Sequence, residues 1–240
     1  MFERPHHQRI AQVLGALDAD LLVKTRCLFG GGTAIALSCG EFRESVDIDF
    51  ICASIDGYRE LRNAITANDL GRLAARPLPM ARAPRADQYG VRCAVLVDGT
   101  PVKFEIVFEG RIDMSPPLPE ERICGIWTLS QADRVATKLM ANADRWADDA
   151  VMSRDIIDLS MLSADGKLDA EGVAKAERAY GQSVTTAFQK AKPHLLERDK
   201  RLRRCMTALK IEMREAELRA RLQRLTLKPT AKAKASHKAG

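Results

Sequence analysis

Apolar positions in the first half of the chain alternate between helical and strand spacing. Residues 8–17 are apolar at positions 10, 13, 14 and 17, which predicts a short amphipathic helix. Apolar residues 28 and 29 run into three glycines at 30–32 and then into a helical stretch, so a strand end, a tight turn and a helix start are expected. Residues 47–53 (DIDFICA) predict a strand and residues 59–75 a helix.

The clearest local signal is a β-hairpin. Two apolar runs, 91–97 and 101–108, flank Asp98, Gly99 and Thr100, and an Asp-Gly turn between such runs is typical of paired antiparallel strands. The three prolines of residues 77–90 predict a loop before the hairpin. After a second proline-rich stretch, 114–121, the pattern becomes helical, and we place a domain boundary between residues 126 and 127.

The second half predicts a helical bundle. Ser130 and Asp133 resemble a capping box that opens a helix to about residue 146, and Ser153 is expected to cap the next helix. Further helices are expected at 171–190 and 194–226, where Met206 and Met213 belong to a stripe suited to core packing. The predicted fold class is α+β: a small mixed-sheet core (1–126), an α-helical domain (127–227) and a disordered basic tail (228–240).

The composition is that of a globular protein in a reducing compartment. Of 240 residues 46% are hydrophobic, yet no apolar run approaches the ~18 residues that span a bilayer, which excludes a membrane protein. The polar N-terminus lacks the apolar segment of a signal peptide, so a cytoplasmic location is expected. Six cysteines without a CxxC pair are expected to be free thiols, and the four histidines have no zinc spacing.

Charge is unevenly distributed along the chain. Residues 190–240 hold 16 Lys and Arg against 5 Asp and Glu, a balance of +11, whereas residues 1–189 hold 22 against 27, a balance of −5. A basic arm of this kind is suited to a polyanion such as nucleic acid. A solvated helix face with a free tail explains the same pattern equally well.

Candidate chemistry begins with an Asp-x-Asp pair on a predicted strand. Side chains alternate along a strand, so Asp47 and Asp49 project from one face, where a divalent cation such as Mg²⁺ would relieve their repulsion. In the hairpin, Glu105 lies opposite an apolar face, and pairing of the hairpin with the Asp-x-Asp strand would complete a three-carboxylate site for two cations. The alternative is that DIDF is simply a strand entering the core.

The glycine turn supplies a second half of the site. Gly31 and Gly32 would let backbone N–H groups approach a phosphate, and Thr33 at the start of the following helix is a further expected donor. No GxxxxGK[ST] or GxGxxG motif is present, which disfavours P-loop and Rossmann folds.

These motifs carry a family resemblance. GGGTAIAL, RESVDIDF, KLMANADR and RDIIDL resemble the AbiEii/AbiGii-type nucleotidyltransferase toxins, a branch of the DNA-polymerase-β-like minimal nucleotidyltransferase superfamily, over residues 28–160. By this resemblance Asp47, Asp49 and Glu105 are the metal-binding catalytic acids, although the superfamily usually has Asp at the third position. The Gly-Gly-Thr turn matches the family's nucleotide-binding element.

The resemblance also implies roles for residues outside the two motifs. Lys138 and Asp155 match the basic and acidic positions that these toxins place over the nucleotide, and Arg145 shares the helix face of Lys138. Arg43 and Ser45 match an Arg-x-Ser stretch; Arg43 would bind a phosphate or support the loop. Asp158 is interpreted as a first-turn helix acid rather than a functional group.

The predicted function is Mg²⁺-dependent transfer of a nucleoside monophosphate from an NTP, such as ATP, to a hydroxyl. By resemblance the acceptor is expected to be RNA, such as a tRNA end, and the protein the toxin of a toxin–antitoxin or phage-defence system with a cognate antitoxin. Two alternatives stay open. The same fold can modify a protein or small-molecule hydroxyl, or the chain can be a catalytically silent nucleic-acid-binding or partner-binding protein.

Overall fold

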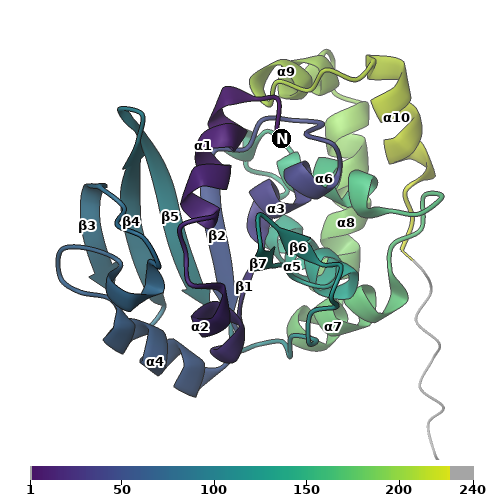
Figure 1. Ribbon diagram of the computed structural model, residues 1–240. Helices are drawn as coiled ribbons and strands as arrows, with labels where there is room; N and C mark the ends of the chain where they lie inside the picture. Colours follow the sequence, from purple (N-terminus) through teal and green to yellow (C-terminus); the bar gives the residue numbers. More distant parts are fainter. Residues whose placement is uncertain (1, 228–240) are drawn as a thin grey trace, which may run out of the picture.

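A five-stranded mixed sheet lies beside a group of packed helices in the computed structural model (Figure 1). The structure describes residues 2–227. The sheet strands are β1 (Cys27–Phe29), β2 (Asp47–Cys52), β3 (Met80–Ala86), β4 (Gly90–Val97) and β5 (Thr100–Phe108), in the order β1-β2-β5-β4-β3. The β2–β5 pair is parallel, and the other neighbours are antiparallel. The predicted α+β class is confirmed.

Helices cover one face of this sheet. They are α1 (Pro5–Leu14), α2 (Ala19–Lys24), α4 (Ile55–Ala64) and the 3-10 turn η1 (Gly71–Leu73). Their apolar side chains join the inward residues of the strands in one core, within which Phe29, Phe50 and Phe104 stack at centroid distances of 5.6 and 5.5 Å. The strict alternation of exposure along β2 follows from this one-sided burial.

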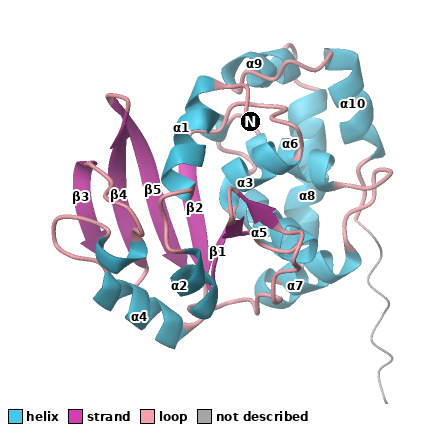
Figure 2. Cartoon of the chain, viewed as in Figure 1, coloured by secondary structure: helices cyan, strands magenta, loops and turns pink. Residues whose placement is uncertain are grey.

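The helices of the second half lie together beside the sheet (Figure 2), and their apolar side chains form a second core. These helices are α5 (Gln131–Arg145), α6 (Arg154–Leu162), α7 (Ala170–Tyr180), α8 (Ser183–Leu196), α9 (Arg201–Ala208) and α10 (Glu215–Arg224), with a 3-10 turn η2 (Asp149–Val151). The small hairpin of β6 (Arg122–Ile123) and β7 (Ile126–Trp127) packs on the sheet core instead, through Ile123 and Ile126. Met206 is buried in this core and Met213 packs against it, as the stripe predicted.

Helix α3 (Gly31–Ser38) belongs to both cores. Ala34 and Leu37 pack with the sheet, whereas Ile35 and Ala36 pack with the helical half. The glycine turn therefore sits where the two parts of the molecule meet.

The hairpin is formed as predicted. Asp98 and Gly99 both have positive φ (48° and 73°), the backbone that a two-residue turn of this kind requires. Val97 pairs with Thr100, and this fixes the register of every later pair along β4 and β5.

The loop predicted for residues 77–90 is wrong for its central part. Residues Met80–Ala86 form the edge strand β3, whose pairing with β4 is irregular between Arg82 and Arg85. Pro84 lies within this irregularity, and proline is tolerated at such a point of an edge strand because the missing N–H breaks no regular pair.

Several helix boundaries also differ from the predictions. The single helix predicted at 59–75 is α4 followed by η1. The helix predicted at 171–190 breaks at Gly181 (φ 61°) into α7 and α8. The helix predicted at 194–226 is divided into α9 and α10. The first helix begins earlier, at Pro5, and α2 and the β6–β7 hairpin were not predicted. Apolar spacing continues across such breaks because both pieces face the same core.

The two predicted caps have different outcomes. Ser130 accepts the Asp133 N–H at 3.1 Å and caps α5 as predicted. Ser153 has a left-handed backbone and no capping bond; its hydroxyl instead accepts from Arg201 at 3.1 Å. The predicted cap at Ser153 is therefore wrong.

Three further expectations concern the cysteines, the C-terminal tail and membrane-spanning helices. All six cysteines are free thiols, although Cys124 is exposed. The predicted disordered tail, 228–240, lies outside the described residues. Within residues 2–227, no helix is long and apolar enough to cross a membrane.

Candidate active site

The sheet wall of the site carries the three predicted acids. In the parallel β2–β5 pair, Asp47 lies opposite Lys103 and Asp49 lies opposite Glu105. Residues paired in this way project from the same face, which is the one turned away from the sheet core. The predicted approach of Glu105 to the Asp-x-Asp pair is confirmed.

Asp49 is the acid of this wall whose charged form is least favoured by its surroundings. Burial raises the pKa of its carboxyl group, and the nearby charges of Asp47 and Glu105 raise it further, against the opposing effect of Lys138. Within residues 2–227 the Asp49 carboxylate has neither a hydrogen-bond donor nor an ion pair, although its backbone carbonyl accepts from Gly30. A partly buried carboxylate in this state favours a bound cation.

Glu105 is held differently from the two aspartates. Its Oε1 accepts from Arg92 Nε at 2.7 Å, and its Oε2 lies 3.6 Å from Lys103 Nζ, which is also 3.6 Å from Asp47 Oδ2. Among the described residues, no three His, Cys, Asp or Glu side chains are grouped to hold a metal ion. The three-carboxylate site for two cations stays a prediction: the three acids share one face of the sheet, and Glu105 is paired with Arg92 and Lys103.

The glycine turn approaches the aspartates closely. Gly31 has φ 66°, and a Cβ atom there would collide with the Asp49 carboxylate; a Cβ atom on Gly32 would collide with Arg43. Glycine is thus required at both positions. The first-turn N–H groups of α3 have no intrahelical acceptor, and the first of them belongs to Gly31, which lies against the Asp49 side chain.

Thr33 does not have the predicted role of a phosphate donor. It is fully buried, and its hydroxyl donates to the Asp47 carbonyl and lies 2.8 Å from Ser45 Oγ. It therefore fastens the loop before β2 to α3. Ser45 lines the cleft itself, and its backbone N–H donates to His7 Nε2 at 3.1 Å.

The helical wall contains a buried chain of alternating charges. Arg43 donates two bonds to Asp158, at 2.7 and 2.9 Å, and Lys138 Nζ lies 2.8 Å from Asp158 and 3.0 Å from Asp155. Arg145 completes the chain with two bonds to Asp155, at 2.7 and 3.0 Å. Three cations surround two anions, so the wall has an excess of one positive charge.

Pairing in this network outweighs burial. Burial alone would raise the pKa of Asp155, but Lys138 and Arg145 hold it well below its ordinary value. Burial likewise opposes ionisation of Arg43, and Asp158 more than compensates, raising the pKa of Arg43. Asp155 and Arg43 are therefore held in their charged forms by their partners.

Sequence reasoning undervalued Asp158 and His7. Asp158 is completely buried and joins Arg43 to Lys138, so its interpretation as an ordinary helix acid is wrong. His7, also buried, bridges Glu41 and the Ser45 N–H; burial lowers its pKa, which keeps the imidazole neutral. His7 belongs to no motif, whereas Asp158 is part of the RDIIDL stretch, so that resemblance was the one signal that could have singled it out.

The two walls enclose a cleft of about 370 Å³. Its lining combines the glycine turn, the acids of the sheet and the cations of the helical wall: Gly31, Gly32, Arg43, Ser45, Asp47, Asp49, Ile51, Lys103, Glu105, Val107, Thr137, Lys138, Ala141, Arg145 and Arg154. Asp155 stands behind Lys138 and Arg145, outside this lining. Acids on one side and cations on the other suit a ligand that carries phosphates and a divalent cation.

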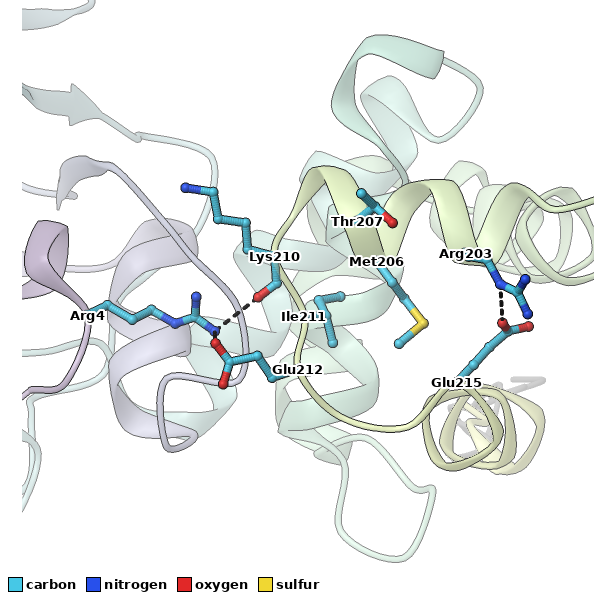
Figure 3. Close-up of a pocket in the computed structure, with 8 residues that line it drawn as sticks. All are labelled: Arg4, Arg203, Met206, Thr207, Lys210, Ile211, Glu212 and Glu215. Carbon is cyan, nitrogen blue, oxygen red and sulfur yellow. Dashed lines mark hydrogen bonds and ion pairs between the residues drawn. The ribbon is translucent and has the colours of Figure 1, made fainter.

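A larger cavity, of about 500 Å³, lies away from this chemistry (Figure 3). It is bounded by α9, the start of α10 and Arg4. Arg4 donates to the Lys210 carbonyl at 3.0 Å and pairs with Glu212, while Arg203 pairs with Glu215 at 3.1 Å. Lys210 pairs with Glu44 outside the cavity, at 2.7 Å. All of these charged groups have partners, and the contacts of Arg4 connect the N-terminal segment to the helical half.

The fold and the cleft have the features of a nucleotidyltransferase, and a family comparison agrees. The chain belongs to the family described as the nucleotidyl transferase AbiEii toxin of a type IV toxin–antitoxin system, which matches residues 12–235. The protein is therefore a nucleotidyltransferase, and the resemblance seen in the motifs is confirmed.

Two crystal structures share the overall arrangement weakly. A chain from H. pylori described as a nucleotidyltransferase is 15% identical, with a TM-score of 0.47 over 90% of this chain and 89% of that one. JHP933 from Helicobacter pylori is 17% identical, with a TM-score of 0.49 over 92% of this chain and 90% of that one. Similarity at this level carries no argument about activity. No curated protein sequence matches the chain.

Proposed function

We propose that this nucleotidyltransferase transfers a nucleoside monophosphate from an NTP to a hydroxyl group of RNA, with a tRNA end as the expected acceptor. The observation that carries the proposal is the cleft itself. An aspartate without a partner faces a cationic wall across a glycine turn.

The donor atoms of the sheet wall fit Mg²⁺. Asp47 and Asp49 offer hard oxygen ligands, and a cation between them would offset the burial and the like charges that raise the pKa of the Asp49 carboxyl. These two residues would hold the metal, and a second ion would also need Glu105, released from Arg92. Mg²⁺ held by these residues would neutralise phosphate charge and lower the pKa of a nearby hydroxyl.

The other residues of the cleft bind and orient the triphosphate. The N–H groups of Gly31 and Gly32, at the start of α3, suit its β and γ phosphates. Lys138 and the half-exposed Arg145 supply positive charge opposite the aspartates. Asp155 positions both cations, while Arg43 and Ser45 hold the loop that leads into β2.

The proposed reaction is a displacement at the α-phosphorus. The acceptor oxygen forms the new P–O bond and releases its proton, and the bond to the oxygen that bridges the α and β phosphates breaks. Pyrophosphate then leaves. In the family's setting this modification would be the action of a toxin, with a cognate antitoxin as the expected partner. Phage defence is the proposed biological context.

One labelling experiment tests this proposal. The protein is incubated with each α-labelled NTP, Mg²⁺ and total RNA, and Asp49→Asn and a sample with EDTA are run in parallel. We expect label on RNA and release of pyrophosphate with at least one NTP. Asp49→Asn should lose about 10³-fold in rate, because a metal ligand contributes several kcal/mol to the barrier.

Three outcomes would contradict the proposal. Label on protein or on a small molecule would mean a different acceptor on the same site. Full activity of Asp49→Asn would remove the metal site from β2. No transfer with any NTP, together with NTP binding that does not depend on metal, would indicate a catalytically silent protein.

A further inference from the structure

The cleft continues onto the outer part of the sheet, where the face opposite the core is not covered by α1, α2 or α4. Two rows of paired residues cross this face from the edge strand β3 to the aspartates. One row is Arg82, Ala94, Lys103 and Asp47; the other is Arg85, Arg92, Glu105 and Asp49. Paired residues of neighbouring strands point to the same side, so Arg92 shares the face of the catalytic acids. Arg82 and Arg85 lie at the outer edge of this face, paired with Ala94 and Arg92 across the irregular part of β3.

The arginines at the outer end of both rows are open to solvent. Arg82 and Arg85 are exposed, and neither has a carboxylate within 4.0 Å among residues 2–227; Arg82 has one long contact, 3.5 Å, to the Cys93 carbonyl. Arg92 divides its guanidinium between Glu105 and Asp87, at 2.7 and 3.2 Å. Three arginines against one aspartate leave an excess of positive charge beyond Glu105.

The basic residues of the C-terminal region behave in the opposite way. Within residues 190–227, Arg201 pairs with Asp149, Arg219 with Glu215 and Lys210 with Glu44, at 2.6, 3.3 and 2.7 Å. Seven of the twelve Lys and Arg residues at 190–227 have an acidic side chain within 4.0 Å, so this part of the predicted basic arm is partly neutralised. The sheet face has arginines without such partners, and it leads directly into the cleft.

This geometry points to an acceptor-binding surface, and the inference rests on the proposed function. We propose that the basic sheet face, defined by Arg82, Arg85 and Arg92, holds the single-stranded end of the acceptor RNA. The reactive hydroxyl of the RNA would lie at Asp47 and Asp49. The backbone phosphates of the nucleotides that precede it would lie over the three arginines. Guanidinium groups bind phosphate through two parallel N–H bonds, which favours arginine here.

The dimensions of the surface favour a short single strand. Three strand spacings separate Arg85 from Asp49, which is about 14 Å. At about 3.4 Å for each stacked nucleotide this distance accommodates about four nucleotides. The face thus contacts only the end of an RNA.

A charge-matched pair of variants tests the surface. Arg82→Gln/Arg85→Gln removes two charges from the basic sheet face, and Arg62→Gln/Arg72→Gln removes two exposed charges from the side that α4 and η1 cover. Neither pair lies in the catalytic cleft. Binding of a fluorescent single-stranded RNA with a free 3′ end is measured by anisotropy at several salt concentrations, without NTP.

We expect Arg82→Gln/Arg85→Gln to weaken RNA binding about tenfold or more, because two charge-assisted contacts are lost. The slope of log K against log salt should become shallower by up to about 1.4, or about 0.7 for each phosphate contact. The control pair should change neither quantity. The increase in Tm caused by Mg²⁺ with NTP should be the same in all three proteins.

Equal losses of RNA affinity in both variants would show a response to net charge alone and would contradict the proposed surface. Unchanged RNA affinity in Arg82→Gln/Arg85→Gln would contradict it as well. Label found only on a protein in the transfer assay would overturn RNA as its occupant. The proposed function can fail separately. If wild type transfers nothing to any acceptor while only the sheet variant loses RNA affinity, the surface stands and the reaction does not.

Discussion

The two walls of the cleft hold charged groups in opposite ways. On the helical wall each buried charge has a partner within 3.0 Å, and Arg43, Lys138 and Arg145 share two aspartates. On the sheet wall Asp49 has no partner in the described residues, and its neighbours raise its pKa. The helical wall is complete as it stands, whereas the sheet wall becomes electrostatically complete only with a cation.

This difference separates stability from function. Removal of one member of the helical wall leaves another charge buried without a partner, which costs folding free energy. Removal of the Asp49 carboxylate from the sheet wall relieves repulsion, so it should lower activity without lowering the stability of the fold.

The largest expected effect on stability is at Asp158. Asp158→Asn keeps the shape of the side chain but leaves Arg43 and Lys138 without their shared anion, and the free energy of unfolding should fall by about 3 kcal/mol. Denaturant unfolding measures this change. The control is Asp56→Asn, whose ion pair with Arg59 is exposed and whose loss should leave the unfolding midpoint unchanged. Similar small effects at both sites would mean that the network contributes little.

Lys138 should combine both kinds of effect. Lys138→Met removes positive charge from the cleft, so affinity for NTP should fall about tenfold, or about 1.4 kcal/mol. Titration calorimetry with a non-hydrolysable NTP measures it. Lys175→Met is the matched control, because Lys175 is an equally buried lysine, paired with Asp133 at 2.6 Å, outside the lining of the cleft. If both variants bind NTP as wild type does, Lys138 only supports the fold.

The smallest expected change is a gain in stability at Asp49. At pH 8 without metal, Asp49→Asn should raise Tm by about 2–4 °C, because a partly buried anion beside Asp47 and Glu105 is removed. The folded pKa of Asp49 is raised, so as pH falls the folded protein binds this proton before the unfolded chain does. Wild type is then stabilised relative to the variant, and the gap in Tm should close as the medium becomes acidic. A gap that is constant between pH 8 and pH 4 would contradict the raised pKa.

The sheet wall was largely predictable because its information is local. Alternation put Asp47 and Asp49 on one face, and the Asp98-Gly99 turn fixed which β4 residue meets each β5 residue. The same register already places Arg92 beside Glu105, so the ion pair between them could have been found.

The helical wall could not be derived in this way. Arg43 and Asp158 are 115 positions apart, and no periodicity connects a loop before β2 with the middle of α6. Burial of Asp158 becomes visible only when α5, α6 and α3 are packed together. The edge strand β3 was missed for a related reason: its pairing with β4 compensates for a composition that by itself resembles a loop.

The dual packing of α3 bears on how the cleft accepts a nucleotide. One side of this helix is fixed in the sheet core and the other in the helical core, and its first turn forms the floor between the two walls. The walls therefore cannot swing apart as separate bodies without unpacking one side of α3. We expect the cleft to be preformed and not to close by a domain movement when nucleotide binds. Little of the binding free energy is then lost to domain rearrangement.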